Sequence, residues 1–91
     1  VSELIAEFGI KQGDVFYDLG SGVGKVAVQI YLESPVKKSV GIELSKTRHD
    51  CGAAILKKLK QEGVLERGRQ LSLVCDDILA REYKDATHMY T

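Results

Sequence analysis

Acidic residues and a glycine turn are the features of this 91-residue chain whose types and spacing could do chemistry. Asp18, Glu43 and the pair Asp76-Asp77 each follow an apolar run. Shortly after the first acid comes a turn, residues 20–24, in which glycine occupies every second position. Such a turn brings main-chain N–H groups against a ligand with no side chain in the way. The pattern therefore predicts a binding site for a nucleotide-like molecule with an acidic rim.

A dinucleotide such as NAD is the first candidate, because a glycine-rich turn followed about 20 residues later by an acid is its usual fingerprint. The pattern G-x-G-x-x-G, however, requires glycine where this chain has Lys25. Asp18 also stands close to where a pyrophosphate would lie, and a carboxylate ~4 Å from a like charge costs up to ~4 kcal/mol at an effective dielectric of 20. The Walker A phosphate loop fails too, because Val26 replaces the required Ser or Thr. The residues disfavour phosphate ligands.

A ligand that carries adenosine but positive charge in place of phosphates reverses this electrostatic argument, and S-adenosylmethionine, with its ammonium and sulfonium groups, is such a ligand. The glycine turn would then approach the methionine part, with Asp18 on its ammonium side. Glu43 can accept both ribose hydroxyls, because an ionised carboxylate only accepts hydrogen bonds. Asp77 can accept from the adenine amino group, with Ile78 and Leu44 as apolar cover for the ring. The acidic rim predicts S-adenosylmethionine as the cofactor.

The elements that must position these residues alternate between strand and helix. Apolar runs predict four strands, over residues 15–19, 39–44, 71–75 and 86–91. Apolar residues at helical spacing predict helices over residues 2–8, 23–33 and 46–62, and a helical turn over 78–83. Ser45 is the expected N-cap of the long helix. This order predicts an α/β fold, a Rossmann-like parallel sheet with helices on both faces, whose strand tips meet at one edge.

The long helix is expected to turn Cys51, Ile55 and Leu59 toward the core and a lysine cluster toward solvent, namely Lys57, Lys58 and Lys60. Cys51 and Cys75 lack CxxC spacing, so both are expected as small buried residues without a disulfide or metal. His49 and His88 have no partner at catalytic or metal-ligand spacing and are expected to be structural.

Composition restricts the broad class. Thirteen basic residues balance thirteen acidic ones, which leaves no basic footprint for nucleic acid. No apolar run approaches the ~20 residues of a membrane span and no signal peptide opens the chain, so we expect an intracellular protein. The length allows one domain at most. A fourth strand at the very end would remain an uncovered edge, so we expect a single segment, residues 1–91, of a larger protein.

The run Asp18-Leu19-Gly20-Ser21-Gly22-Val23-Gly24, followed by Gln29 and by Val40-Gly41-Ile42-Glu43, resembles the cofactor-binding half of class I methyltransferases. It is most similar to the disruptor-of-telomeric-silencing (non-SET) type of histone-lysine methyltransferase. The resemblance covers residues 15–78. It implies cofactor contacts at Asp18, Gly20, Gly22, Gly24, Glu43, Asp77 and Ile78, the last in place of the aromatic residue that often follows the acid.

The same resemblance implies methyl transfer from S-adenosylmethionine to an unprotonated lysine amine of a protein substrate, a histone in the nucleosome, and a nuclear location. It assigns no catalytic residue here, because the motif that lines the family's lysine channel follows the fourth strand, beyond Thr91. Two alternatives stay open from the residues themselves. One is a non-catalytic Rossmann-like module that binds an adenosine ligand or a partner chain, and the other is an NAD-binding domain.

Overall fold

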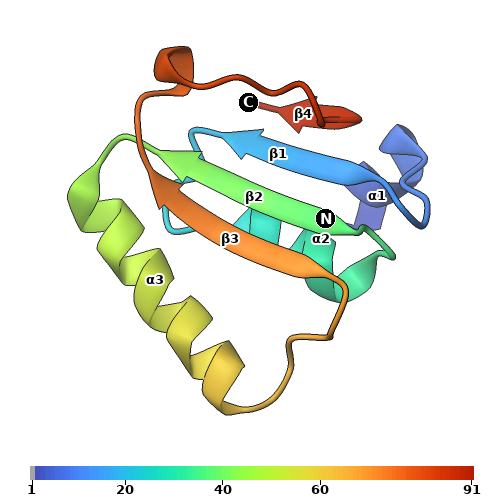
Figure 1. Cartoon of the computed structure of the whole chain (residues 1–91), viewed down its shortest axis with the longest axis horizontal. Helices are drawn as coiled ribbons and strands as arrows, with labels where there is room; N and C mark the ends of the chain where they lie inside the picture. The colour runs from blue at the N-terminus through green and yellow to red at the C-terminus, as the bar shows by residue number, and fades with distance from the viewer. Residues whose placement is uncertain (1) are drawn as a thin grey trace.

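A computed structural model of the chain, which describes residues 2–91, contains one four-stranded parallel sheet with strand order β3-β2-β1-β4. The strands are β1 (Val15–Leu19), β2 (Lys38–Glu43), β3 (Gln70–Cys75) and β4 (His88–Tyr90). All four point the same way, so their carboxyl ends gather at the left-hand edge in Figure 1. The parallel sheet predicted from the sequence is confirmed, although β2 ends at Glu43 and leaves Leu44 in the following loop.

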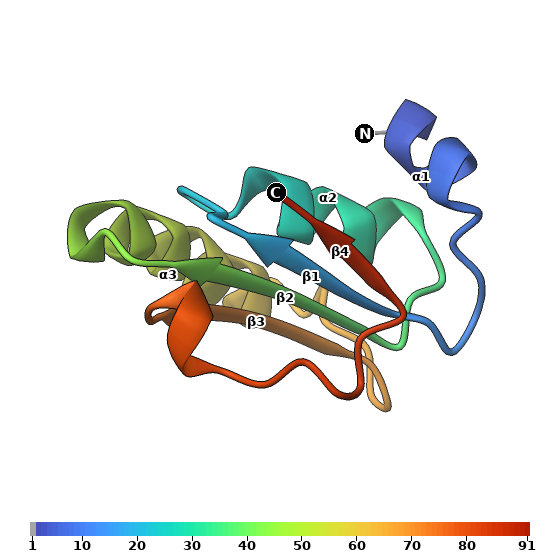
Figure 2. The ribbon, with the colours of Figure 1, turned by 90° about the horizontal axis from the view of Figure 1, so that it is seen from above.

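The helices are α1 (Ser2–Phe8), α2 (Lys25–Glu33) and α3 (Lys46–Gln61), and a short 3₁₀ helix, η1 (Ile78–Ala80), follows β3. Figure 2 shows α2 and α3 on one side of the sheet and the β3–β4 connection, with η1, on the other. This is the arrangement that right-handed crossovers produce when the chain steps outward from β1 to β3 and then returns to β4. Among residues 2–91, no helix combines the length and apolar character that crossing a bilayer requires.

The core has two apolar layers, one on each face of the sheet. Phe16 packs with Ile30 and Val36 on the helix side. Tyr17 and Val40 belong to the other layer, which the β3–β4 connection covers with the side chains of Tyr83 and Ala86. Successive strand residues point to opposite faces, so β1 and β2 are buried on both sides. The nearly continuous apolar pattern of residues 15–19 predicted this for β1.

The orientation of α3 corrects one expectation. Cys51 is exposed and Ile55 is 48% exposed, whereas Gly52 is buried. A Cβ atom on Gly52 would collide with the backbone carbonyl of Val23, so the helix lies directly against the chain that follows the glycine turn. The smallest residue of the helix therefore sets the packed face, and the predicted stripe of larger side chains is rotated partly into solvent.

The predicted burial of both cysteines is wrong, since Cys75, at the end of β3, is exposed like Cys51. The lysine cluster on α3 is exposed, as predicted. His88 ties distant segments together: one ring nitrogen lies 2.9 Å from the Phe8 carbonyl oxygen and the other 2.9 Å from the Thr87 hydroxyl. Its predicted structural role is confirmed.

Candidate functional site

The glycine turn after β1 is fixed to the end of β2 by main-chain hydrogen bonds. Gly20 N–H and Ser21 N–H both donate to the Ile42 carbonyl oxygen, at 2.8 and 2.9 Å. Gly20 and Gly22 have φ angles of +82° and +60°, which side-chain-bearing residues rarely adopt. A Cβ atom at either position would meet nothing within 4 Å. The turn therefore presents bare backbone toward open space, as a ligand contact requires.

Beneath the turn, glycines allow a close approach between layers. A Cβ atom on Gly24 would come within 2.8 Å of the Leu73 side chain, and one on Gly41 would come within 2.8 Å of Ser21. Gly41 and Gly52 were not identified as site residues from the sequence. The available signal for Gly41 was a glycine inside a β-branched strand, which marks a close backbone approach.

Glu43, the acid at the tip of β2, is fully engaged with backbone donors. Its Oε1 accepts a hydrogen bond of 2.6 Å from Gly22 N–H, and its Oε2 accepts one of 2.8 Å from Ser45 N–H. The residue is 7% exposed. These donors, Ser45 N–H foremost, together with the positive charge of Arg48, hold the pKa of the Glu43 carboxyl below its usual range. Glu43 is therefore ionised at neutral pH.

Asp18, the acid at the tip of β1, has the opposite electrostatic character. It is 4% exposed, and its carboxylate has no hydrogen-bond partner among residues 2–91. Burial, and secondarily the charge of Glu43, raise the pKa of the Asp18 carboxyl to about 6. Alternation along β1 and β2 places both acids on the helix side of the sheet. The site therefore contains a buried carboxylate that would gain from a positively charged partner.

The acids after β3 complete the edge. Asp77 caps η1, because its Oδ1 accepts a 2.9 Å hydrogen bond from Leu79 N–H. Asp76 pairs with Arg81 at 3.4 Å, and its N–H donates to the Glu43 carbonyl oxygen at 3.1 Å. Ile78 is 37% exposed beside them. The predicted residues of all three strand tips thus lie along one edge, with Asp18 and Glu43 adjacent and Asp77 on the neighbouring tip.

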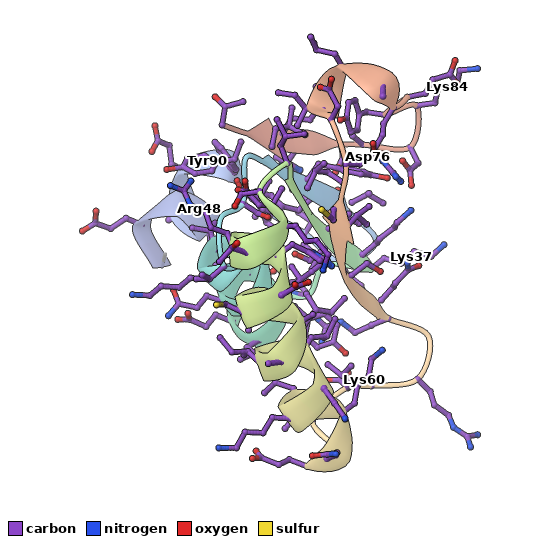
Figure 3. The ribbon with its side chains drawn as sticks, turned by 90° about the vertical axis from the view of Figure 1, so that its left-hand side faces the viewer. Lys37, Arg48, Lys60, Asp76, Lys84 and Tyr90 are labelled. Atoms are coloured by element: carbon purple, nitrogen blue, oxygen red, sulfur yellow. The ribbon has the colours of Figure 1, made fainter. Side chains whose placement is uncertain are left out.

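Two further residues of this edge were not identified as site residues from the sequence. Figure 3 looks onto the strand tips and shows Arg48 at the start of α3 and Tyr90 at the end of β4. Tyr90 is paired with Asp18 in the register of β4 and β1. Arg48 follows the N-cap Ser45, whose Oγ accepts a 3.4 Å hydrogen bond from Arg48 N–H, and so confirms the predicted cap. Only the folded chain brings Tyr90 next to an acid 72 positions earlier.

A cavity of about 670 Å³ lies at the other end of the sheet. Its lining includes Leu32, Pro35, Lys37 and Arg69, and none of the predicted site residues. Arg69 has a structural task there, because its guanidinium donates to the carbonyl oxygens of Tyr31, Ser34 and Val36. The cavity therefore lies at the edge of the sheet opposite to the predicted site residues. The acids and the glycine turn favour the carboxyl edge as the functional site.

Comparisons with known proteins identify the family and the fold. The family model described as "Histone methylation protein DOT1" matches residues 1–66. A "Histone-lysine N-methyltransferase, H3 lysine-79 specific" from Kluyveromyces lactis is 32% identical over 94 residues, which cover 82% of this chain and 16% of that protein. A protein of the same description from Caenorhabditis elegans is 49% identical over 43 residues, covering 47% of this chain and 4% of that protein. The chain thus spans less than a fifth of these relatives.

Among solved structures, an RNA methyltransferase from Salinibacter ruber in complex with S-adenosyl-L-homocysteine superimposes with a TM-score of 0.75 at 24% identity, over 97% of this chain and 53% of that one. Phosphoethanolamine N-methyltransferase 2 from Haemonchus contortus, in complex with S-adenosyl-L-methionine, gives a TM-score of 0.59 at 26% identity, over 82% of this chain and 16% of that one. The fold is therefore the Rossmann-like fold of methyltransferases.

Proposed function

The chain belongs to the DOT1 histone methylation protein family, and on that premise we propose that it is the cofactor-binding part of an S-adenosylmethionine-dependent methyltransferase that acts on a histone lysine. The observation that carries the proposal is the pair of buried acids beside the glycine turn. Asp18 lacks a partner, and Glu43 is ionised next to it. A cationic adenosine ligand suits this pair, whereas a pyrophosphate would add a third negative charge.

The residues present fit the cofactor part by part. Asp18 would hold the ammonium group, and the bare backbone at Gly20 and Gly22 would lie along the methionine part. Gly24 contributes indirectly, because its contact with Leu73 seats the turn. Each Glu43 oxygen uses one acceptor position for a backbone N–H, which leaves a second position for a ribose hydroxyl.

The adenine end falls to the segment after β3. Asp77 uses Oδ1 for its cap and retains Oδ2 to accept from the adenine amino group, and the half-exposed Ile78 would cover the ring. The cofactor supplies an electrophilic methyl group on its sulfonium sulfur. The chain's own residues bind and orient, since alignment and exclusion of water are what such a transfer asks of a protein. We assign no catalytic residue among residues 2–91.

The substrate part of the proposal rests on family membership and on the relatives described as specific for lysine 79 of histone H3. We propose a histone lysine, presented in the nucleosome, as the methyl acceptor, and a nuclear location with it. In the family, the motif that lines the lysine channel follows the fourth strand, so we assign no acceptor-binding residue among residues 2–91.

Calorimetric titration with S-adenosylmethionine and with NAD tests the cofactor. We expect binding of the first and none of the second. Glu43→Ala should abolish measurable binding, because it removes the ribose acceptors. Asp50→Ala, which removes a carboxylate that is 56% exposed on α3, is the matched control and should bind normally. Binding of NAD alone would refute the proposal, and cofactor binding without methylation of histone H3 by the full-length protein would identify a non-catalytic module.

A further inference from the structure

Glu43 links the glycine turn to the start of α3 through its side chain, in addition to the close approach of Gly52 to Val23. Its carboxylate bridges Gly22 N–H at 2.6 Å and Ser45 N–H at 2.8 Å, so that one side chain holds both the tip of the glycine turn and the start of α3. Hydrogen bonds from N–H to an ionised carboxylate are shorter and about twice as strong as neutral ones.

The tip of the turn depends on this bridge more than its flanks do. Gly20 N–H and Ser21 N–H donate to the Ile42 carbonyl oxygen, and Gly24 N–H donates to the Ser21 carbonyl oxygen. Gly22 N–H, at the tip, has Glu43 as its acceptor. The φ of +60° at Gly22 shows that the backbone there is in an unusual conformation, which the bond to Glu43 helps to hold.

We propose that Glu43 is a positioning residue that couples the two halves of the cofactor site, so that a ribose diol on its carboxylate loosens Gly22 N–H and frees the tip of the turn for the methionine part. The coupling rests on the proposed function, because it requires a ligand with a ribose diol. The bridge itself is independent of the proposed function. Its physical basis is competition: hydroxyl donors on the same two oxygens weaken the charge-assisted bonds already there. Binding of the ribose would thereby make Gly22 N–H available to the methionine part of the cofactor.

Amide hydrogen exchange in the unliganded protein, followed by nuclear magnetic resonance, tests the bridge. Glu43→Gln keeps the shape of the side chain but has one acceptor oxygen in place of two, so one of the two bridged amides must lose its acceptor. We expect exchange at Gly22 or Ser45 to accelerate at least about tenfold, a factor that corresponds to about 1.4 kcal/mol. The Ser21 amide, which donates to Ile42, should not change, and Asp50→Asn should change none of the three.

Unchanged exchange at both bridged amides in Glu43→Gln would overturn the bridge. If that variant fails to fold, the wild-type protein still decides, because a hydrogen bond of 2.6 Å to a carboxylate must move the Gly22 amide proton far downfield. A Gly22 proton at an ordinary random-coil position, with unprotected exchange, would overturn the bridge equally.

Titration with adenosine and with 2′,3′-dideoxyadenosine tests the coupling. Adenosine should shift the Gly22 amide proton upfield and accelerate its exchange several-fold, and the dideoxynucleoside, which lacks the diol, should not. Adenosine that perturbs Asp77 and Ile78 but leaves Gly22 unchanged would overturn the coupling. No response to adenosine anywhere at this edge would overturn the proposed cofactor instead, and the exchange measurements in the unliganded protein would still decide the bridge.

Discussion

Replacement of Asp18 by Asn should stabilise the fold while it destroys the site. The wild-type carboxyl is buried, has no hydrogen-bond partner among residues 2–91 and lies near the ionised Glu43, so its pKa is raised from 3.8 to about 6. A carboxyl whose pKa is higher in the folded than in the unfolded chain opposes folding once it is ionised. Asn has nearly the same shape and no charge, so the opposing contribution disappears.

The size of the effect follows from the shift in pKa. A shift of about two units corresponds to about 3 kcal/mol, at about 1.4 kcal/mol per unit. The buried amide of Asn offsets part of this gain, because an unsatisfied polar group costs about 1–3 kcal/mol. We therefore expect the free energy of unfolding at pH 7.5 to rise by about 1 kcal/mol, with an upper limit near 3.

The pH dependence identifies the cause. The folded protein binds more protons at Asp18 than the unfolded chain does between about pH 4 and pH 6, so this residue's destabilising contribution fades as the pH falls through 6. The stability of Asp18→Asn relative to the wild type should therefore be highest above pH 7 and should fall by about 3 kcal/mol toward pH 4, where the cost of the buried amide makes the variant the less stable of the two. Urea unfolding monitored by far-ultraviolet circular dichroism at pH 4.5, 6.0 and 7.5 measures it.

Asp85 provides a control of opposite sign. Its carboxylate accepts hydrogen bonds of 2.9 Å from both Lys38 Nζ and the Tyr17 hydroxyl, Lys38 foremost, and these hold the pKa of its carboxyl below the usual range. Asp85→Asn should accordingly destabilise the fold at pH 7.5, and the loss should shrink as the wild-type carboxylate is protonated at low pH. A variant Asp18→Asn that is less stable than wild type at pH 7.5, by an amount independent of pH, would refute the reasoning.

Three other outcomes follow from packing. Both Cys51 and Cys75 should react with a thiol reagent such as Ellman's reagent in the native protein without denaturant, and titration of fewer than two thiols would contradict their exposure. Gly52→Ala should lower the free energy of unfolding by about 2 kcal/mol or more, because the added Cβ would collide with the Val23 carbonyl oxygen. Thermal unfolding measures this loss. Arg69→Met should cost about 2–4 kcal/mol in urea unfolding, since three carbonyl oxygens lose their donor.

The sequence predicted the features that depend on local pattern. A nearly continuous apolar run identified β1 as a strand covered on both faces, a β-branched core identified β2 as a strand, and Ser45 was recognised as a cap from its type and place. The acids at the strand tips could be assembled into one edge because parallel strands share the direction of their carboxyl ends. Those inferences need only the chain order and the handedness of the crossovers.

The orientation of α3 could not be predicted in this way. Helical periodicity favours the stripe with the largest side chains, which contains Cys51 and Ile55. The folded chain instead uses the absence of a side chain at Gly52 to approach the Val23 carbonyl. That choice depends on the shape of a partner surface built by another segment, and hydrophobic spacing along one helix contains no information about it. The bridge made by Glu43 could not be predicted either, because it depends on how the glycine turn and the start of α3 lie around its carboxylate.

The two buried acids divide the work of recognition between them. They lie at one edge and on one face, yet burial and the charge of Glu43 raise the pKa of the Asp18 carboxyl, whereas backbone N–H donors, Ser45 foremost, lower that of Glu43. Among residues 2–91, no donor bonds to the Asp18 carboxylate. A ligand at this edge would therefore contact Glu43, which already accepts hydrogen bonds from the turn and α3, and Asp18, which has no counter-charge among residues 2–91. Hydroxyl groups can bond to the first, and a cation would in addition compensate the buried charge of the second. The ammonium group is common to S-adenosylmethionine and to the S-adenosylhomocysteine left after transfer. On the proposed function, Asp18 would therefore anchor donor and product alike, and any preference between them would come from groups near the sulfur.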